Sequence, residues 1–382
     1  MLFAYRACTW LTILSIAALA GCAGDERLRE RAPRPADVRA QIVGLLPATT
    51  ADRAGWAVDI YAAFAALGIT PSVPNICAVL AVTEQESTFR ADPAVPQLAR
   101  IAWDEIDRRA ERLGVPRLAV HLALQISSPN GKSYSERIDA VTTEQELSRI
   151  FEDFIGMVPM GNRLFAGLNP VRTGGPMQVS IAFAERHVQT HTYPYPVAGS
   201  IRHEVFTRRG GLYFGIAHLL DYPAVYDRHL YRFADFNAGR YASRNAAFQS
   251  AVSHASGIAL GLDGDLVRHG DDAEAKTGST ELAVRAIGKQ LDLNHTMIRS
   301  GLEQGDSPDF ERSTLYKRVF ELAERLERRP LPRAVVPRIA LQSPKITRKL
   351  TTEWFATRVD DRHRRCLGRA AAPPGTASTA SK

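Results

Sequence analysis

Several common signatures are scarce or missing in this sequence of 382 residues. It has four cysteines, and none stands with histidines or other cysteines at a spacing typical of a metal site. No cofactor motif is present, and no series of alternating apolar and polar residues indicates a large β-sheet. The sequence therefore predicts a mainly α protein that works without a cofactor or a metal ion.

The composition is that of a folded protein. Apolar residues make up 45% of the chain and charged residues 23%, which is enough apolar material for one large core or two domains. The formal net charge is +7, with basic clusters at residues 208–209, 328–329 and 362–365. Each cluster is either a solvated helix face or a contact for an anionic polymer, and charge alone does not choose between them.

The N-terminus has the layout of a signal peptide over residues 1–21. Arg6 precedes an apolar run that ends before Asp25, and the run is too short for a permanent transmembrane anchor, which is the alternative. Leu19-Ala20-Gly21-Cys22 resembles the lipobox of bacterial lipoproteins, which implies lipidation of Cys22 and attachment to a membrane. Ala follows this cysteine where the family's inner-membrane signal has Asp, so the expected location is the periplasmic side of the outer membrane. Export argues against a nucleic-acid partner.

Two cysteines stay unmodified in this scheme. Cys8 leaves with the signal peptide and Cys22 carries lipid, which leaves Cys77 and Cys366. An oxidising periplasm permits a disulfide between them, whereas the apolar helical surroundings of Cys77 equally suit a buried free thiol.

The rest of the chain divides by composition. Residues 22–52 are expected to form a flexible tether, and residues 367–382 a disordered tail. Residues 53–262 are expected to form the main helical domain, with a helical insertion at about 90–170, and residues 279–366 a C-terminal helical region.

Two shorter segments are expected to be irregular or turn-like. Between the main domain and the C-terminal region, Asp263-Gly264-Asp265 lacks the full spacing of a calcium loop and fits a polar linker better. A short hairpin is expected around residues 125–134, where Pro129-Asn130-Gly131 favours a turn.

The predicted helices cover most of the chain. Helical periodicity runs from residue 54 onward and includes Ile76, Val79, Leu80 and Thr83; it recurs at 97–113, 140–156, 176–189, 208–220, 244–260, 279–291, 309–329 and 345–365. In the stretch 309–329, Leu315, Val319, Leu322 and Leu326 predict one apolar stripe.

Three motifs in order resemble the lysozyme-like lytic transglycosylases of the SLT type, which cleave peptidoglycan glycan strands. An apolar helix ends in Glu86-Ser87-Thr88-Phe89; Gly175-Pro176-Met177-Gln178 resembles the family's Gly-Leu-Met-Gln; and Phe236-Asn237-Ala238-Gly239 resembles its Tyr-Asn-Ala-Gly. The resemblance covers roughly residues 55–255, and the whole chain also resembles a group of proteobacterial lipoproteins of unknown function. It implies a lysozyme-like domain in which Glu86 is the one catalytic carboxyl and Ser87, Met177, Gln178 and Asn237 bind the sugar.

The chain departs from the family pattern in three places. Glu86 and Met177 are 91 positions apart, which makes residues of about 90–170 an insertion that would roof or block the cleft. Phe236 replaces the family's tyrosine and removes a hydroxyl expected to hold the substrate or the acid. Pro176 replaces a leucine, a smaller change of backbone shape.

The chemistry itself explains why one glutamate at the end of an apolar helix is the candidate acid. Cleaving a glycosidic bond needs a carboxylic acid that stays protonated near neutral pH, and apolar surroundings favour that form. Glu84 is the rival of Glu86, but it lies two residues away on the helix and is expected on a solvated face. Glu204 and Asp235 are candidate second carboxylates for a water-using enzyme, with surface placement as the alternative.

The leading functional hypothesis is an envelope lytic transglycosylase that acts on peptidoglycan. A non-catalytic, lysozyme-like protein that binds or assembles the cell wall is the main alternative, and a hydrolytic muramidase is the third. The sequence identifies no protein partner.

Overall fold

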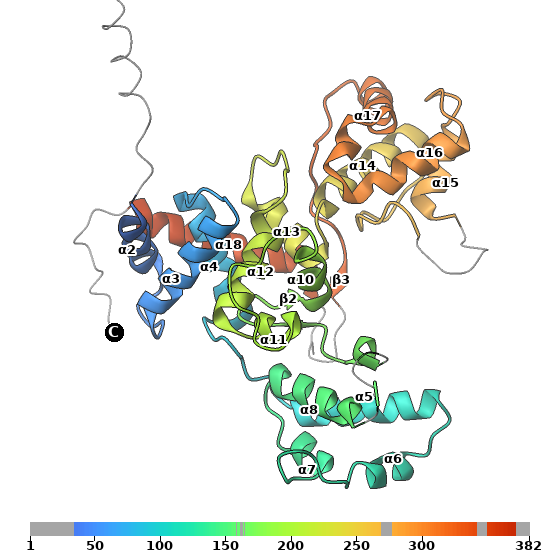
Figure 1. Ribbon diagram of the computed structural model, residues 1–382. Helices are drawn as coiled ribbons and strands as arrows, with labels where there is room; N and C mark the ends of the chain where they lie inside the picture. The colour runs from blue at the N-terminus through green and yellow to red at the C-terminus, as the bar shows by residue number, and fades with distance from the viewer. Residues whose placement is uncertain are drawn as a thin grey trace, which may run out of the picture.

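The computed structural model describes residues 34–157, 159, 160, 163, 165–268, 277–341 and 350–371. Over these residues the protein is mainly α-helical, as the sequence predicts. The helices gather in three bodies, which Figure 1 shows as a central main body, an insertion below it and a C-terminal body beside it. Cys22 and the predicted signal peptide lie outside the described residues. Among the helices that are described, none is long and apolar enough to cross a membrane.

The main body is formed by segments from both ends of the chain. Its elements are α2 (Pro35–Leu45), α3 (Arg53–Ala66), α4 (Val73–Ser87), β1 (Thr173–Gly174), β2 (Val179–Ser180), α10 (Ile181–His187), α11 (Ile201–Val205), α12 (Arg208–Leu220), α13 (His229–Ala238) and α18 (Thr352–Ala371). The two strands form an antiparallel hairpin with Thr173 opposite Ser180. One apolar core unites these elements.

Helices α4 and α12 form the centre of this core. Every residue of α4 from Ile76 to Thr83 is buried, as expected for a helix that is apolar all round. The Ser72 hydroxyl caps its first turn by accepting a hydrogen bond from the Asn75 amide, with Pro74 where a first turn tolerates it. Helix α12 is buried from Gly210 to Ala217 and contacts α3, α4, α13 and the hairpin. These contacts place the three predicted motifs around one central helix.

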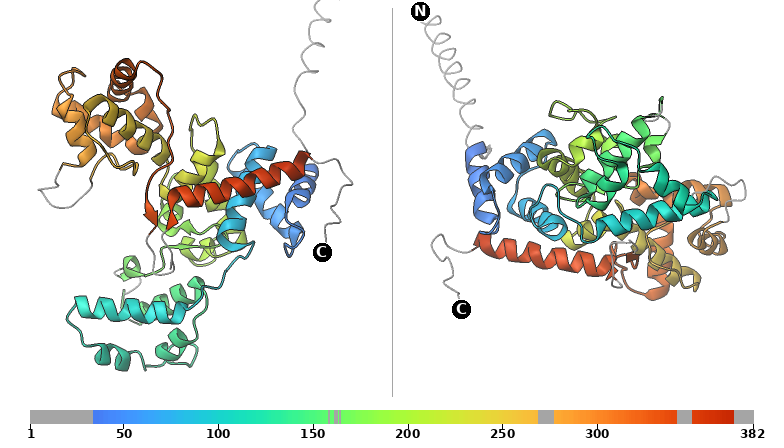
Figure 2. Two further views of the ribbon diagram at one scale, coloured as in Figure 1. Left: turned by 180° about the vertical axis from the view of Figure 1, so that it is seen from behind. Right: turned by 90° about the horizontal axis from the view of Figure 1, so that it is seen from below.

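Helix α18 closes the main body from the C-terminal end of the chain. It packs against α4 and α13, and Figure 2 shows it lying across the back of the molecule. Cys366 on α18 forms a disulfide with Cys77 on α4, so the alternative of two free thiols is wrong. The last predicted helix therefore belongs to the main body and not to a C-terminal region of residues 279–366.

Helix α2 corrects the expected tether. Residues 35–45 are helical, and Val38, Ile42 and Leu45 are buried against the main body. Arg369 on α18 also donates a hydrogen bond to the Leu45 carbonyl at 2.9 Å. The alanines and arginines of this stretch suggested a solvated chain, but three apolar residues at helical spacing are enough to dock it.

The insertion is helical, as predicted. It comprises α5 (Leu98–Arg112), α6 (Arg117–Ala123), α7 (Tyr134–Asp139), α8 (Glu144–Gly156) and the short 3-10 helix η1 (Ala166–Leu168). Capping boxes start α7 at Ser133 and α8 at Thr143. The predicted hairpin near residues 125–134 is reduced to a single bridge between Ser127 and Ser133.

The C-terminal body begins earlier than expected. It contains α14 (Ala242–Ser256), α15 (Ser279–Ala286), α16 (His295–Leu302), η2 (Glu303–Asp306), η3 (Pro308–Arg312) and α17 (Thr314–Glu327), and the strands β3 (Ala340–Leu341) and β4 (Leu350–Thr351) lead back to α18. Phe248 of α14 packs with Phe310 and Tyr316, so α14 belongs to this core and the boundary lies before residue 242. Leu315, Val319 and Leu322 form the predicted stripe, whereas Leu326 is exposed.

Candidate active site

Glu86 lies in the last turn of α4, in a half-buried position. Glu84 is also half-buried, and its carboxylate forms ion pairs with two arginines of α18, at 3.5 Å from Arg362 Nε and 3.8 Å from Arg365 Nη2. The expectation that Glu84 lies on a solvated face is therefore wrong. Side chains two residues apart on a helix leave it in nearly opposite directions, so the contact of Glu84 with α18 does not extend to Glu86 by helix geometry alone.

The chain turns sharply after Glu86. Thr88 and Phe89 both adopt left-handed backbone conformations, with φ of 51° and 57°. Ser87 is 5% exposed, and its hydroxyl donates to the Thr83 carbonyl at 3.0 Å and accepts from the Arg90 amide at 3.3 Å. The Ser87 hydroxyl therefore stabilises the end of α4. It was predicted to bind substrate, but its position is that of a buried structural group.

The Gly175–Gln178 turn joins β1 to β2 and packs closely against α12. Met177 is fully buried, and a Cβ at Gly215 would lie only 2.5 Å from its Sδ, so this glycine permits the close approach of turn and helix. Gln178 is half-buried; its side-chain oxygen accepts from the Thr173 hydroxyl at 3.2 Å, and its amide donates to the Gly175 carbonyl at 3.4 Å. Of the two predicted binding residues here, Gln178 offers polar groups, whereas the Met177 side chain acts through packing.

Asn237 lies at the exposed end of α13. Its side-chain oxygen accepts a hydrogen bond from the Thr352 hydroxyl at 3.0 Å, and Thr352 is the buried first residue of α18. The preceding Phe236 contacts the His218 ring at a centroid distance of 5.1 Å. Burial lowers the pKa of His218 to about 4, so this imidazole is neutral at pH 7. Phe236, at the position of the family's tyrosine, thus packs against a neutral imidazole.

The elements that carry the three motifs belong to one core. Glu86, Gln178 and Asn237 do not line the cavity of the insertion that is described below. Val82 of α4, Met177 of the turn and Phe233 of α13 are members of the same apolar cluster. The sequence missed the part that α18 plays here. It contributes Thr352 to Asn237 and two arginines to Glu84, and only long-range packing reveals these contacts.

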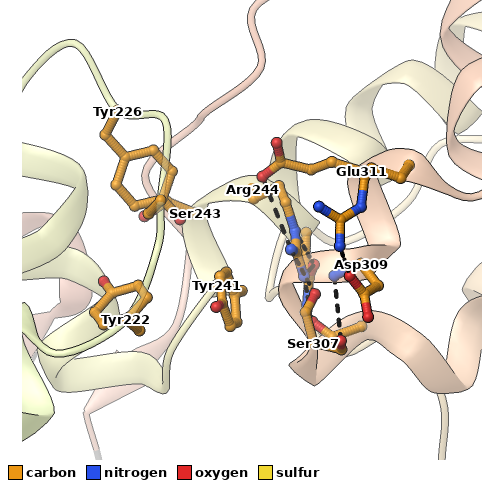
Figure 3. Close-up of polar contacts among 12 residues, drawn as sticks. Tyr222, Tyr226, Tyr241, Ser243, Arg244, Ser307, Asp309 and Glu311 are labelled. Atoms are coloured by element: carbon orange, nitrogen blue, oxygen red, sulfur yellow. Dashed lines mark hydrogen bonds and ion pairs between the residues drawn. The ribbon is translucent and has the colours of Figure 1, made fainter.

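The candidate second carboxylates are both buried, which corrects their expected surface placement. Asp235 is fully buried and accepts four hydrogen bonds, from the Tyr226 hydroxyl and the Ser243 amide at 2.7 Å each, the Tyr241 amide at 3.0 Å and the Tyr222 hydroxyl at 3.1 Å. Figure 3 shows these tyrosines and Ser243 beside Arg244. Asp235 therefore stabilises the connection between α13 and α14, and its burial leaves no access for a water molecule.

Glu204 has a similar structural role. It is 1% exposed and accepts from the Tyr193 hydroxyl at 2.8 Å and the Ala198 amide at 3.1 Å, and Arg209 forms an ion pair with it at 3.2 Å. These contacts hold the pKa of Glu204 below its usual value in spite of burial. Neither Asp235 nor Glu204 is available as the second carboxylate of a hydrolytic site.

The buried Arg244 lies in the first turn of α14, next to the point where the C-terminal body begins. Its guanidinium lies 4.2 Å from the Tyr241 ring and donates to the backbone carbonyls of Ser307, at 2.9 Å, and Gly305 (Figure 3). Glu311 lies 3.8 Å away as its charge partner. Because a buried charge is tolerated only when it is paired and hydrogen-bonded, these contacts fix α14 against η2 and η3 within the C-terminal body.

Among the described residues, one group has the composition of a metal site. Ligand atoms of His187, His191 and Asp221 lie within 4.8 Å of one another. Burial and the neighbouring His191 lower the pKa of His187 to about 4, which keeps its ring neutral. The two imidazole rings are stacked in parallel at 4.2 Å, however, and Arg240 adds a positive charge nearby. We assign no metal to this group.

The fold and the motifs define a mainly helical protein in which a half-buried glutamate ends a central apolar helix. Comparison with known proteins gives the family: the chain belongs to DUF1615, described as a protein of unknown function, whose match covers residues 49–369. It is 56% identical over 358 residues to the "Uncharacterized protein YaiW" of Escherichia coli (strain K12), which covers 94% of this chain and 97% of that protein. No solved structure matches the chain.

Proposed function

We propose that this protein is an envelope lipoprotein that cleaves peptidoglycan glycan strands as a lytic transglycosylase, with Glu86 as acid and base. The observation that carries the proposal is the convergence of three motifs far apart in sequence on one apolar core around α12. The resemblance to the lysozyme-like family rests on the same motifs. Glu86 is half-buried and follows the buried apolar stretch of residues 76–83, and apolar surroundings are the setting in which glycosidases place a general acid.

In the proposed reaction, Glu86 serves twice. It first donates its proton to the glycosidic oxygen of the leaving sugar, while the substrate's own acetamido group stabilises the positive charge that develops at the anomeric carbon. The resulting carboxylate then takes the proton from the C6 hydroxyl, whose oxygen closes onto the anomeric carbon and gives an anhydro end. Gln178 and Asn237 are the candidate sugar contacts.

The buried, hydrogen-bonded positions of Glu204 and Asp235 favour a lytic transglycosylase over a muramidase. A water-using glycosidase needs a second carboxylate beside the acid, and both candidates are committed to buried hydrogen bonds. An enzyme that uses the substrate's acetamido group needs no such residue.

Export and lipidation of Cys22, with attachment to the outer membrane, belong to the same proposal. The Cys77–Cys366 disulfide supports it, because stable disulfides form in the periplasm and are rare in a reducing cytosol. Peptidoglycan lies in the same compartment.

The alternative of a non-catalytic wall-binding protein has its own support. Phe236 replaces the family's tyrosine, and the Ser87 hydroxyl is buried and bound to the backbone. Under this alternative the protein binds purified sacculi and releases nothing from them. Phe236→Tyr would then be the first change to test for recovered activity.

Digestion of purified sacculi tests the proposal. The wild-type protein should release anhydro-terminated muropeptides, and Glu86→Gln should reduce their release by about 100-fold or more, because it removes the transferable proton and keeps the side-chain shape. Glu84→Gln is the matched control on the same helix. It should retain activity, although loss of charge beside Arg362 and Arg365 will lower stability slightly. Full activity of Glu86→Gln would refute the assignment, and equal loss in both variants would indicate an effect on helix packing.

A further inference from the structure

The insertion has a half-open cavity of about 910 Å³. Its walls come from α5, α6, α7 and α8 and from the segment 170–173 that leads into β1. Protein interiors are packed nearly as tightly as organic crystals, and their voids are seldom larger than a water molecule. A hollow of this size therefore lies beside the small hydrophobic core of the insertion, which includes Leu98, Ile138 and Ile150.

Most of the side chains that line the cavity are apolar. Its aliphatic and aromatic lining includes Ile101, Ile106, Val120, Leu147, Ile150 and Phe154. Apolar walls of this kind hold water poorly and bind apolar molecules instead. The volume is within the range of small-molecule sites, which are about 300–1,000 Å³.

The polar groups of the cavity indicate an amphiphile with an anionic end. Arg108 and Arg109 line it and share one carboxylate, Glu105, at 2.5 Å and 2.6 Å, which leaves a net positive charge at this group. Arg172 adds a further guanidinium at the wall. Tyr134 also lines the cavity; it is fully buried, and its hydroxyl has no hydrogen-bond partner in the structure. A buried, unsatisfied hydroxyl is rare in native proteins, but the charged neighbours of this one are Asp153 and Arg137, which do not line the cavity, so the anionic end is assigned to the arginines.

Helix α6 forms a loosely held wall. None of its residues is buried, and Leu118 and Leu122 are 72% and 63% exposed on its outer side. Leu113, just before the helix, is 80% exposed. A short helix with so little buried surface opens locally at low free-energy cost, so α6 provides a route into the cavity.

From these observations we infer that the insertion binds a long acyl chain of an anionic amphiphile, either a free fatty acid or a membrane phospholipid. The chain fills the apolar cavity between α5 and α8, and the carboxylate or phosphate lies toward Arg108, Arg109 and Arg172. This site is separate from Glu86 and does not depend on the function proposed for it.

Photo-crosslinking in cells tests this inference on the full chain without detergent. Cells that express the protein are grown with a fatty acid that carries a diazirine in its chain and an alkyne at its end, and are then irradiated. Adducts on the purified protein are located by peptide mass spectrometry. We expect them within residues 98–173, and the adduct mass distinguishes a free fatty acid from a phospholipid.

Two tryptophan variants of α6 provide the matched comparison. Val120 lines the cavity, whereas Leu118 is exposed on the same helix and does not line it. Val120→Trp fills the cavity and should reduce these adducts by about tenfold or more, while Leu118→Trp should leave them unchanged. Ala102→Leu, from the α5 wall, fills the same space and serves as a second filling variant if Val120→Trp accumulates poorly.

Three results would overturn the inference. The first is adducts spread over the protein surface with no preference for residues 98–173. The second is retention of the adducts in both cavity-filling variants, and the third is equal loss in Leu118→Trp and Val120→Trp.

Discussion

Helix α12 in the main body and helix α6 in the insertion differ most clearly in how they are packed. Helix α12 is buried along most of its length, with Leu212, Phe214 and Ile216 fully inside the core, whereas α6 has no buried residue. Two buried acids of the main body, Asp235 and Glu204, accept several hydrogen bonds each, while Tyr134 in the insertion has a buried hydroxyl without a partner.

This difference in packing matches the requirements of the two sites that we propose. Acid catalysis needs a carboxyl held in a fixed environment, and the closely packed core around α4 and α12 provides that. Binding of a variable apolar ligand needs a wall that opens, and α6 provides that. The two parts meet at Thr173, which lines the cavity and donates its hydroxyl to Gln178 at 3.2 Å.

The largest difference in stability should appear when one leucine side chain is removed from α12 and, separately, one from α6. Leu212→Ala in α12 removes a fully buried side chain and should lower the free energy of unfolding by about 2–5 kcal/mol. Leu118→Ala in α6 should change it by about 0.5 kcal/mol or less, because that side chain is already in water. Urea denaturation measures both. An equal loss of unfolding free energy in both variants would mean that α6 is packed as tightly as α12 and would contradict the difference between the two helices.

The disulfide should stabilise the main body and have less effect on the insertion. Replacing Cys77 and Cys366 together by Ala should cost about 2–5 kcal/mol, because the bridge ties α4 to α18 across most of the chain. Hydrogen exchange measured by peptide mass spectrometry should show faster exchange in α4 and α18 and little change in α5 to α8. Faster exchange confined to the insertion would contradict this assignment.

Mild acid should weaken the main body. Burial lowers the pKa of His187, His218 and His229 to about 4, below the unfolded value of about 6.5. Between those values the unfolded chain binds more protons than the folded chain, so stability is present above pH 6.5 and is lost as the pH falls toward 4. We expect the melting temperature to fall by about 5 °C or more between pH 7.5 and pH 5. His218→Gln should show a smaller fall, and an equal fall would exclude His218 as a contributor.

Sequence patterns predicted the parts that depend on local spacing. Helices α5 and α12 lie close to their expected bounds because each has a continuous apolar or amphipathic pattern. The surroundings of the acids were harder to predict, since their partners come from distant segments. Glu84 meets arginines of α18, and Asp235 is enclosed by tyrosines from the loop after α12 and by the start of α14. Charge alone suggested a surface for both residues, and tertiary packing decided otherwise.

The cavity shows a second limit of prediction from sequence patterns. The apolar residues of the insertion predicted helices with buried faces, and those helices are present. Helical periodicity identifies the face that turns inward, but not how completely the opposing faces fill the space between them. The cavity beside the small apolar core of α5, α7 and α8 therefore depends on how the helices are connected, which no local pattern records.

Digestion of sacculi in water enriched in ¹⁸O tests the central claim most directly, because the proposed reaction closes the new end with the substrate's own C6 oxygen. Mass spectrometry of the released muropeptides should show anhydro ends without ¹⁸O, and release should depend on Glu86. Reducing ends that carry one ¹⁸O atom would identify a hydrolase and contradict the proposed use of the C6 oxygen. Binding of sacculi without any released product would contradict catalysis itself.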